Sequence, residues 1–144
     1  MTNKISMRMH RADGRWVNLV DLLGLVPDND HSWSFLDFEG VGGKGPRGES
    51  ILEFEELIED SRAGYVLSWT ELVRFAGQLK QIINCRLVAA RAVADLERVS
   101  AEAGGDTEAE VVVEAFDSTT WEVQATDPEL VRRFSGFAAA DRVG

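Results

Sequence analysis

Few residues in this chain have side chains that could perform catalysis. His10 and His31 are the two histidines, and no cysteine or second histidine lies at metal-ligand spacing from either one. His31, with Asp28 and Asp30 close in sequence, could serve as a general base for a nucleophile such as Ser118. That chemistry requires His31 and Ser118 to meet in the fold, and Ser118 is also explained as a turn residue. The sequence therefore predicts no catalytic centre and no metal site.

Two ligand-binding motifs are present only in part. Residues 40–45 match GxGxxG, but the third glycine of that motif must open a helix at the pyrophosphate, and here Pro46 follows it. Residues 28–39 begin like a calcium-binding loop, but Trp33 occupies the sixth position, where the sharp turn needs glycine. We therefore expect no cofactor and no enzymatic activity, and we look for a binding function instead.

The composition is that of a globular protein of the cytoplasm. The chain has 144 residues, 44% hydrophobic and 28% charged, which is enough to bury a core without disulfides. The single cysteine, Cys85, lies in an apolar run and is expected to be a buried thiol in a reducing compartment. Residues 1–8 have no apolar segment of a signal peptide, and no stretch approaches eighteen uninterrupted apolar residues. We therefore expect a cytoplasmic chain that does not enter the membrane.

The acidic charge is concentrated in two blocks. The net charge is −10, which argues against nucleic acids and anionic membranes, because both bind cationic surfaces. Residues 28–60 hold ten acidic and two basic residues, and residues 99–131 hold nine acidic residues and no Lys or Arg. A solvated acidic surface without a partner explains such blocks as well as a binding surface does.

As a binding surface, the acidic blocks would attract a cationic protein partner. Charge of one sign raises the association rate of an oppositely charged partner, while buried aromatic anchors supply most of the affinity. Trp33 and Trp69 are the candidate anchors, whereas Trp16 and Trp121 are expected in the core. The predicted partner-binding residues are Glu53, Glu55, Glu56, Glu59, Asp60, Glu108, Glu110, Trp33 and Trp69.

The hydrophobic pattern predicts one domain over residues 1–144, with a mostly antiparallel sheet packed against two to four helices. Strands and helices are mixed without regular βαβ alternation, which is typical of the α+β class. A flexible glycine-rich loop at 40–48 and a frayed tail at 138–144 are expected. The expected strands are 4–10, 32–39, 65–67, 111–116 and 121–125. The expected helices are 19–26, 69–83, 92–103 and 128–137, and the type of element over 51–58 is open.

Two segments leave the type of element open. Ser50 and Glu53 form a capping-box pattern that favours a helix over 51–58, but a strand is also compatible with it. The helical spacing that begins at Leu72 continues beyond Ile83, and a helix of about 35 residues would be unusually long. We therefore expect a break near Asn84, with either a strand or a kinked helix over 82–90.

Tyr65–Leu72 leads into an amphipathic helix, and Ile82–Cys85, Phe116–Val123 and Asp127–Leu130 follow it. In these segments, roughly the last half of the chain resembles the small immunity proteins of bacterial polymorphic toxin systems. The resemblance implies a cytosolic antitoxin that neutralises a cognate toxin by occluding its active site, and it carries over no functional residue. The alternatives are an adaptor or assembly module that uses the same acidic face for a non-toxin partner, and a small ligand-binding protein or enzyme.

Overall fold

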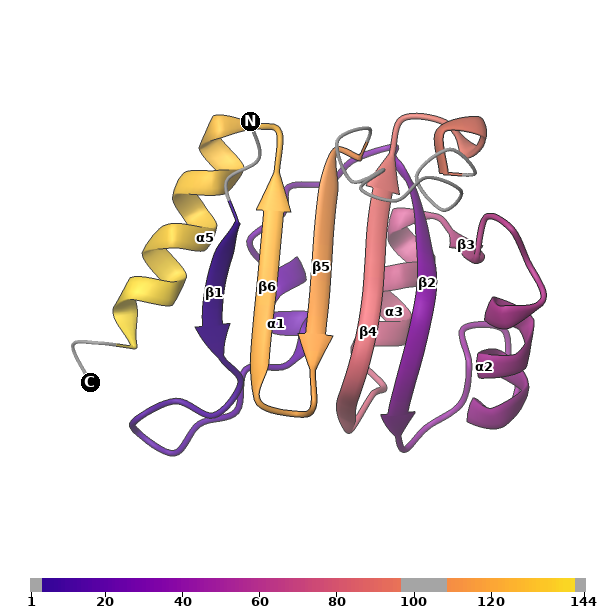
Figure 1. Cartoon of the computed structure of the whole chain (residues 1–144), viewed down its shortest axis with the longest axis horizontal. Coiled ribbons are helices and arrows are strands. Elements are labelled where there is room, and N and C mark those ends of the chain that lie inside the picture. The colour runs from indigo at the N-terminus through magenta and orange to yellow at the C-terminus, as the bar shows by residue number, and fades with distance from the viewer. Residues whose placement is uncertain (1–3, 97–108, 142–144) are drawn as a thin grey trace.

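The computed structural model in Figure 1 describes residues 4–96 and 109–141 and has the predicted α+β architecture. Within those residues, six antiparallel strands form one sheet in the order β1–β6–β5–β4–β2–β3. The strands are β1 (Ile5–Arg8), β2 (Ser32–Val41), β3 (Tyr65–Leu67), β4 (Gln81–Ala90), β5 (Val111–Phe116) and β6 (Thr120–Ala125).

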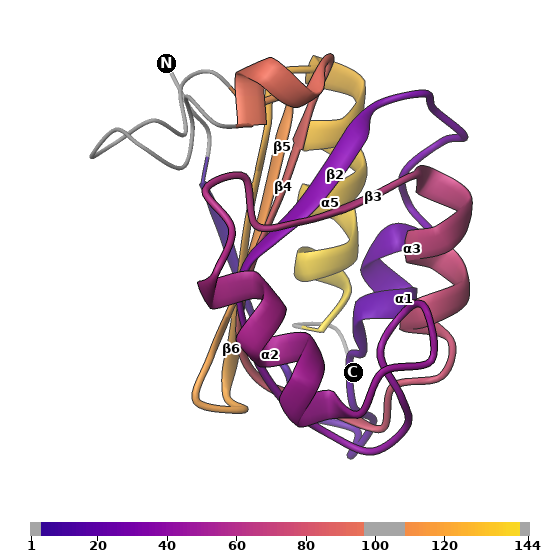
Figure 2. The ribbon, with the colours of Figure 1, turned by 90° about the vertical axis from the view of Figure 1, so that its right-hand side faces the viewer.

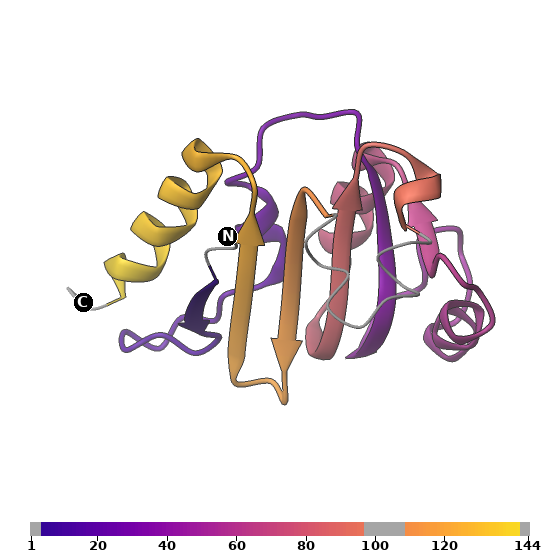
Figure 3. The same ribbon diagram turned by 45° about the horizontal axis from the view of Figure 1, so that its top comes forward.

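Most of the helices cover one face of the sheet. Figure 2 shows α1 (Leu19–Leu23), α3 (Trp69–Ala76) and α5 (Pro128–Ala140) on the same side of the strands. The helix α2 (Ile51–Glu59) lies instead at the edge of the sheet, where it packs against β2, and Figure 3 shows α2 and α5 at opposite ends of the strand order. The short β3 pairs only with Trp33–Phe35, so α2 covers the part of β2 that no strand covers. No helix in the described part of the chain is long and apolar enough to cross a membrane.

The main core lies between the sheet and its helices. A β-bulge between Phe35 and Asp37 shifts the alternation by one residue, so Phe35 and Phe38 of β2 both point to this side, where they meet Phe54 of α2 and Phe75 of α3. The rings pack mostly edge to face, with centroids 5.0 to 5.9 Å apart. The opposite face of the sheet holds a smaller cluster, made of Ala63, Val88, Ala90, Leu96, Ala109 and Val112.

The two open element assignments are settled. Residues 51–59 are helical, and the Ser50 side chain accepts the N–H of Glu53 as the capping pattern predicts. Residues 82–90 belong to a strand, β4, which pairs with both β2 and β5. The helix expected over 69–83 was predicted too long, because α3 ends at Ala76 with Gly77 as its C-cap. Of the helix predicted over 92–103, residues 93–96 are helical and residues 97–103 lie outside the described part.

The glycine-rich loop and the C-terminal end differ in detail from the expectations. Strand β2 continues through Gly40 to Val41, and the chain turns at Gly42 and Gly43, whose positive φ angles favour glycine. The helix α5 continues past Ala138 to Ala140, and the Asp141 carboxylate accepts a hydrogen bond from Arg8 at 2.7 Å, so ordered structure extends beyond the predicted start of fraying. The flexibility of 40–48 stays a prediction, and residues 142–144 lie outside the described part.

Candidate protein-binding surface

The helix α2 carries most of the predicted binding residues, and its burial pattern decides which of them face outward. Phe54 and Ile58 are buried on the side that packs against β2. Leu52, Glu56 and Glu59 follow one another at helical spacings of four and three, so they share the opposite side. Leu52 is 67% exposed. An exposed leucine therefore lies among carboxylates on the outward side of this helix.

Two strand carboxylates extend this acidic region beyond the helix. A β-bulge between Phe35 and Asp37 places Asp37 opposite Arg86, and Glu39 pairs with Asn84 on the same side of the sheet. Both Asp37 and Glu39 are exposed, because the intervening Phe38 points into the core. We call the α2 surface the set of residues that this arrangement creates: Asp37, Glu39, Leu52, Glu53, Glu55, Glu56, Leu57, Glu59 and Asp60.

The pKa of the half-buried Glu55 shows how the negative charges of the α2 surface act on one another. Burial raises the pKa of the Glu55 carboxyl, and the negative charges of Glu39, Glu59 and Asp37 raise it further. A raised carboxyl pKa means that the ionised form is disfavoured by its surroundings. The negative charges on α2 and β2 therefore repel one another in the folded chain.

Cations do not neutralise this surface within the described residues. Each Lys or Arg ion pair described there involves a carboxylate outside the α2 surface. Glu39 accepts a hydrogen bond from the Asn84 side chain at 2.8 Å, and Glu53 accepts one from the Ser50 hydroxyl at 3.2 Å, but both donors are neutral. Among the described residues, the α2 surface thus has hydrogen-bond donors at Glu39 and Glu53, and none of these ion pairs with a Lys or Arg involves it.

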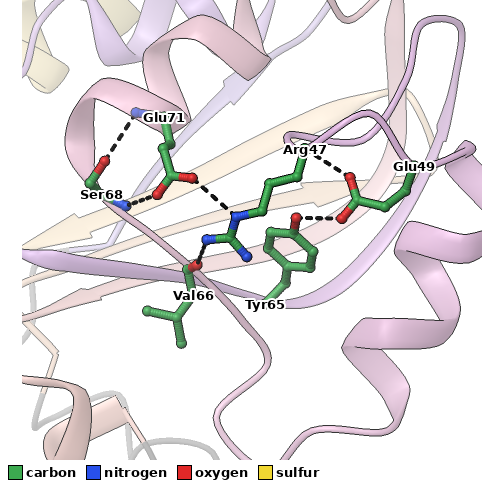
Figure 4. A network of polar contacts seen from close by, with 6 residues as sticks. All are labelled: Arg47, Glu49, Tyr65, Val66, Ser68 and Glu71. Atoms are coloured by element: carbon green, nitrogen blue, oxygen red, sulfur yellow. Dashed lines mark hydrogen bonds and ion pairs between the residues drawn. The ribbon is translucent and has the colours of Figure 1, made fainter.

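A polar network around Arg47 fixes the entry to α2 (Figure 4). The Arg47 guanidinium donates to Glu71 at 3.2 Å and to the Val66 carbonyl at 3.0 Å. Glu49 accepts the Arg47 backbone N–H at 2.8 Å and the Tyr65 hydroxyl at 2.5 Å. These contacts connect the segment before α2 to β3 and to the start of α3.

The two carboxylates of this network are held in their ionised form. For Glu49, burial alone would raise the pKa, but hydrogen bonds from Tyr65 and from backbone N–H groups, with the Arg47 charge, lower it. For Glu71, the N–H of Ser68 is the largest cause of a lowered pKa, and Arg47 adds to it. Burial and the neighbouring Glu49 carboxylate raise the pKa of Tyr65. Glu49 belongs to the acidic block of the sequence, but it is compensated locally and lies outside the α2 surface.

The predicted aromatic anchors occupy different environments. Trp33 is fully buried, so the prediction that it anchors a partner at the surface is wrong. Trp69 is half-buried, packs against Trp33 at a centroid distance of 5.4 Å and donates its indole N–H to Asp28 at 3.1 Å. Trp121 is a core residue as predicted, whereas Trp16 is 50% exposed, contrary to the prediction. The ring of Trp16 stacks on His10 at the surface, so the indole has a packing partner without being in the core.

The second acidic block is not joined to the α2 surface. Glu110 is half-buried, pairs with Arg91 at 3.0 Å and accepts the Thr126 hydroxyl at 2.6 Å. These partners lie at the ends of β4 and β6, away from α2. Glu108 lies outside the described residues. A contact of Glu108 or Glu110 with a partner stays a prediction.

The residues considered for catalysis do not meet. Ser118 lies in the β5–β6 turn and donates its backbone N–H to the Ile83 carbonyl near the start of β4. His31 directly precedes Ser32, which is paired with Ala90 at the end of β4. Ile83 and Ala90 are seven residues apart, which spans roughly 23 Å at the rise of a strand, so His31 cannot act as the base for Ser118. Among the described residues, no group of three or more His, Cys, Asp or Glu side chains could hold a metal ion.

Comparison with protein-family models, with curated proteins and with solved structures finds no match for this chain.

Proposed function

We propose that this chain is a protein-binding domain that acts without catalysis and that recognises a cationic protein through the α2 surface. We further propose that the partner is a cognate bacterial toxin, which the chain neutralises in the cytoplasm as an immunity protein. The observation that carries the proposal is the uncompensated charge of the α2 surface. The fold retains carboxylates that repel one another at Glu55, although a neutral side chain there would relieve that repulsion.

A cationic partner would remove this repulsion on binding. Lys or Arg side chains of the partner would pair with Glu56 and Glu59, and Leu52, one turn before Glu56, would enter an apolar site on the partner. The Arg47 network fixes the segment before α2 to β3 and α3, and α2 packs against β2, so the surface is presented by a well-anchored element and loses little entropy on binding. Inhibition would follow from coverage of a cationic active site, the kind of cleft that a toxin acting on nucleic acids or nucleotides presents.

The direct test is co-expression with the protein encoded by the neighbouring gene. Rescue of growth and a complex of fixed stoichiometry on gel filtration are expected if that protein is the toxin. A complex without any toxicity of the partner alone would support instead the adaptor function, because the same surface would then serve a harmless partner. Neither a complex nor rescue would refute the immunity proposal for that pair.

Charge reversal locates the contact. The double variant Glu56→Lys and Glu59→Lys should slow association by about 10-fold or more at low salt, because both carboxylates are exposed and steer a cationic partner. The matched control reverses Asp13 and Glu129, two exposed carboxylates on the opposite edge of the sheet, and changes the net charge equally. Equal association rates for the two double variants would show that total charge, and not the α2 surface, controls encounter.

A further inference from the structure

A cavity lies at the end of the sheet where the β1–α1 segment passes the α3–β4 connection. Its volume is about 340 Å³, within the range of about 300 to 1,000 Å³ that small-molecule sites occupy. At roughly 30 Å³ per water molecule, it would hold about eleven waters or a compound of similar size. Residues 16–19 line it from one side, and residues 79–82 line it from another.

The floor of this cavity is apolar. It includes Met9, Val17, Leu19 and Ile82, all of which belong to the main core. Trp121 also lines it, and the indole N–H of Trp121 already donates to the Val17 carbonyl at 2.9 Å. The floor therefore offers carbon surface and ring faces, with no free donor on Trp121 that a polar ligand could use.

The rim of the cavity is aromatic. Trp16 lines the cavity while remaining half exposed, so it separates the apolar floor from solvent. The Trp16 ring stacks on His10 with an interplanar angle of 27° and a centroid distance of 5.1 Å. This contact holds the indole in a defined orientation, which favours a flat ligand that packs against it.

A single cation, Lys80, is present on the cavity wall. Its side chain runs so close to Gly42 that a Cβ on this glycine would lie 2.6 Å from Cγ and Cδ of Lys80. The carbon stem of Lys80 is therefore placed by packing. The Lys80 ammonium makes no ion pair with any residue that the structure describes. In a chain with 25 acidic and 15 basic residues, an unpaired lysine beside an apolar cavity is available to a ligand anion.

From these features we infer that the cavity binds a small aromatic carboxylate. The ring would pack on the floor and against Trp16, and the carboxylate would pair with the Lys80 ammonium at the wall. This site is separate from the α2 surface and does not rest on the proposed function.

The test uses 3-phenylpropionate as the probe and 3-phenyl-1-propanol as its neutral analogue. Both are titrated into the ¹⁵N-labelled protein, and the indole N–H signals of Trp16 and Trp121 are followed by NMR. We expect both signals to shift with the carboxylate and its affinity to be about 5-fold higher than that of the alcohol, the value of one exposed ion pair. Absence of a shift at these two indoles, or equal affinities for the acid and the alcohol, would overturn the inference.

Two lysine variants distinguish a specific ion pair from general charge. Lys80→Met should abolish the preference for the acid over the alcohol, while Lys44→Met should retain it, because Lys44 is exposed and does not line the cavity. Trp16→Ala should weaken both compounds by about 2- to 10-fold through loss of ring contact. Loss of the preference in both lysine variants would exclude Lys80 as the specific counterion. The Glu56→Lys, Glu59→Lys protein should bind the probe like wild type, so this result is independent of the partner experiment.

Discussion

Replacement of Glu55 by Gln should make the protein more stable and a weaker binder. Burial raises the pKa of Glu55, and the charges of Glu39, Glu59 and Asp37 raise it further. Glu55 and Glu59 form a like-charged pair at helical i, i+4 spacing, which costs about 0.2–0.5 kcal/mol. With a similar contribution from each of the two β2 carboxylates, the repulsion amounts to about 1 kcal/mol at low ionic strength. Gln has nearly the helix propensity of Glu, so removal of the charge is the main effect of the substitution.

Urea denaturation at pH 7, followed by the fluorescence of the buried Trp33 and Trp121, measures the expected increase in the free energy of unfolding. With an m value of about 2 kcal/mol/M, a gain of about 1 kcal/mol raises the midpoint by about 0.5 M. Glu56→Gln is the matched control, since Glu56 is on the exposed side and is not among the charges that act on Glu55. The gain should shrink in 1 M NaCl, where the Debye length is about 3 Å.

The pH dependence of the free energy of unfolding provides a second test of the effect of Glu55. Because the folded-state pKa of Glu55 is raised, its ionisation destabilises the fold as the pH rises through that pKa, and acidification relieves the cost. Wild type and Glu55→Gln should therefore differ most at neutral pH and approach each other as the pH falls toward the unfolded-state pKa of Glu. An equal gain in Glu56→Gln, or a gain that persists unchanged in 1 M NaCl, would refute the account of mutual repulsion.

Three further outcomes are expected from the network and the core. Arg47→Met should lower the free energy of unfolding by about 1–2 kcal/mol, because two hydrogen bonds to Glu71 and Val66 are lost; Lys44→Met in the same loop should change it little in urea titrations. Tyr65→Phe should cost about 1–2 kcal/mol, because it leaves a half-buried carboxylate with one donor fewer. The lowered folded-state pKa of Glu49 gives stability above about pH 4.5 that is lost on acidification. Loss of the Tyr65 hydroxyl should therefore make acid unfolding begin at a higher pH, and an unchanged acid transition would contradict that role of the hydroxyl. Cys85 is buried with a raised thiol pKa, so a thiol reagent should label it only at the rate of opening, and rapid labelling of the native protein would show that β4 is less protected than its pairing implies.

The local signals of the sequence determined where several elements begin and which sides they bury. Ser50 and Ser68 cap the two helices that their patterns predict, since a hydroxyl three residues before Glu satisfies an orphan N–H without any tertiary contact. Period-two alternation in Val111–Phe116 directs Val113 and Ala115 to the core, and Asp117 with Ser118 forms the expected turn.

The tertiary structure alone decided which charges remain uncompensated and which aromatic residues are buried. Glu49 and Glu55 belong to one acidic block, yet Arg47 and Tyr65 lower the pKa of Glu49, while burial and the carboxylates of Glu39, Glu59 and Asp37 raise the pKa of Glu55. That difference depends on the β2 bulge and on the docking of α2, which bring together groups distant in sequence. Trp33 is buried and Trp16 is exposed, the reverse of the prediction. The reason is the same, since burial depends on packing between elements and no single segment encodes it.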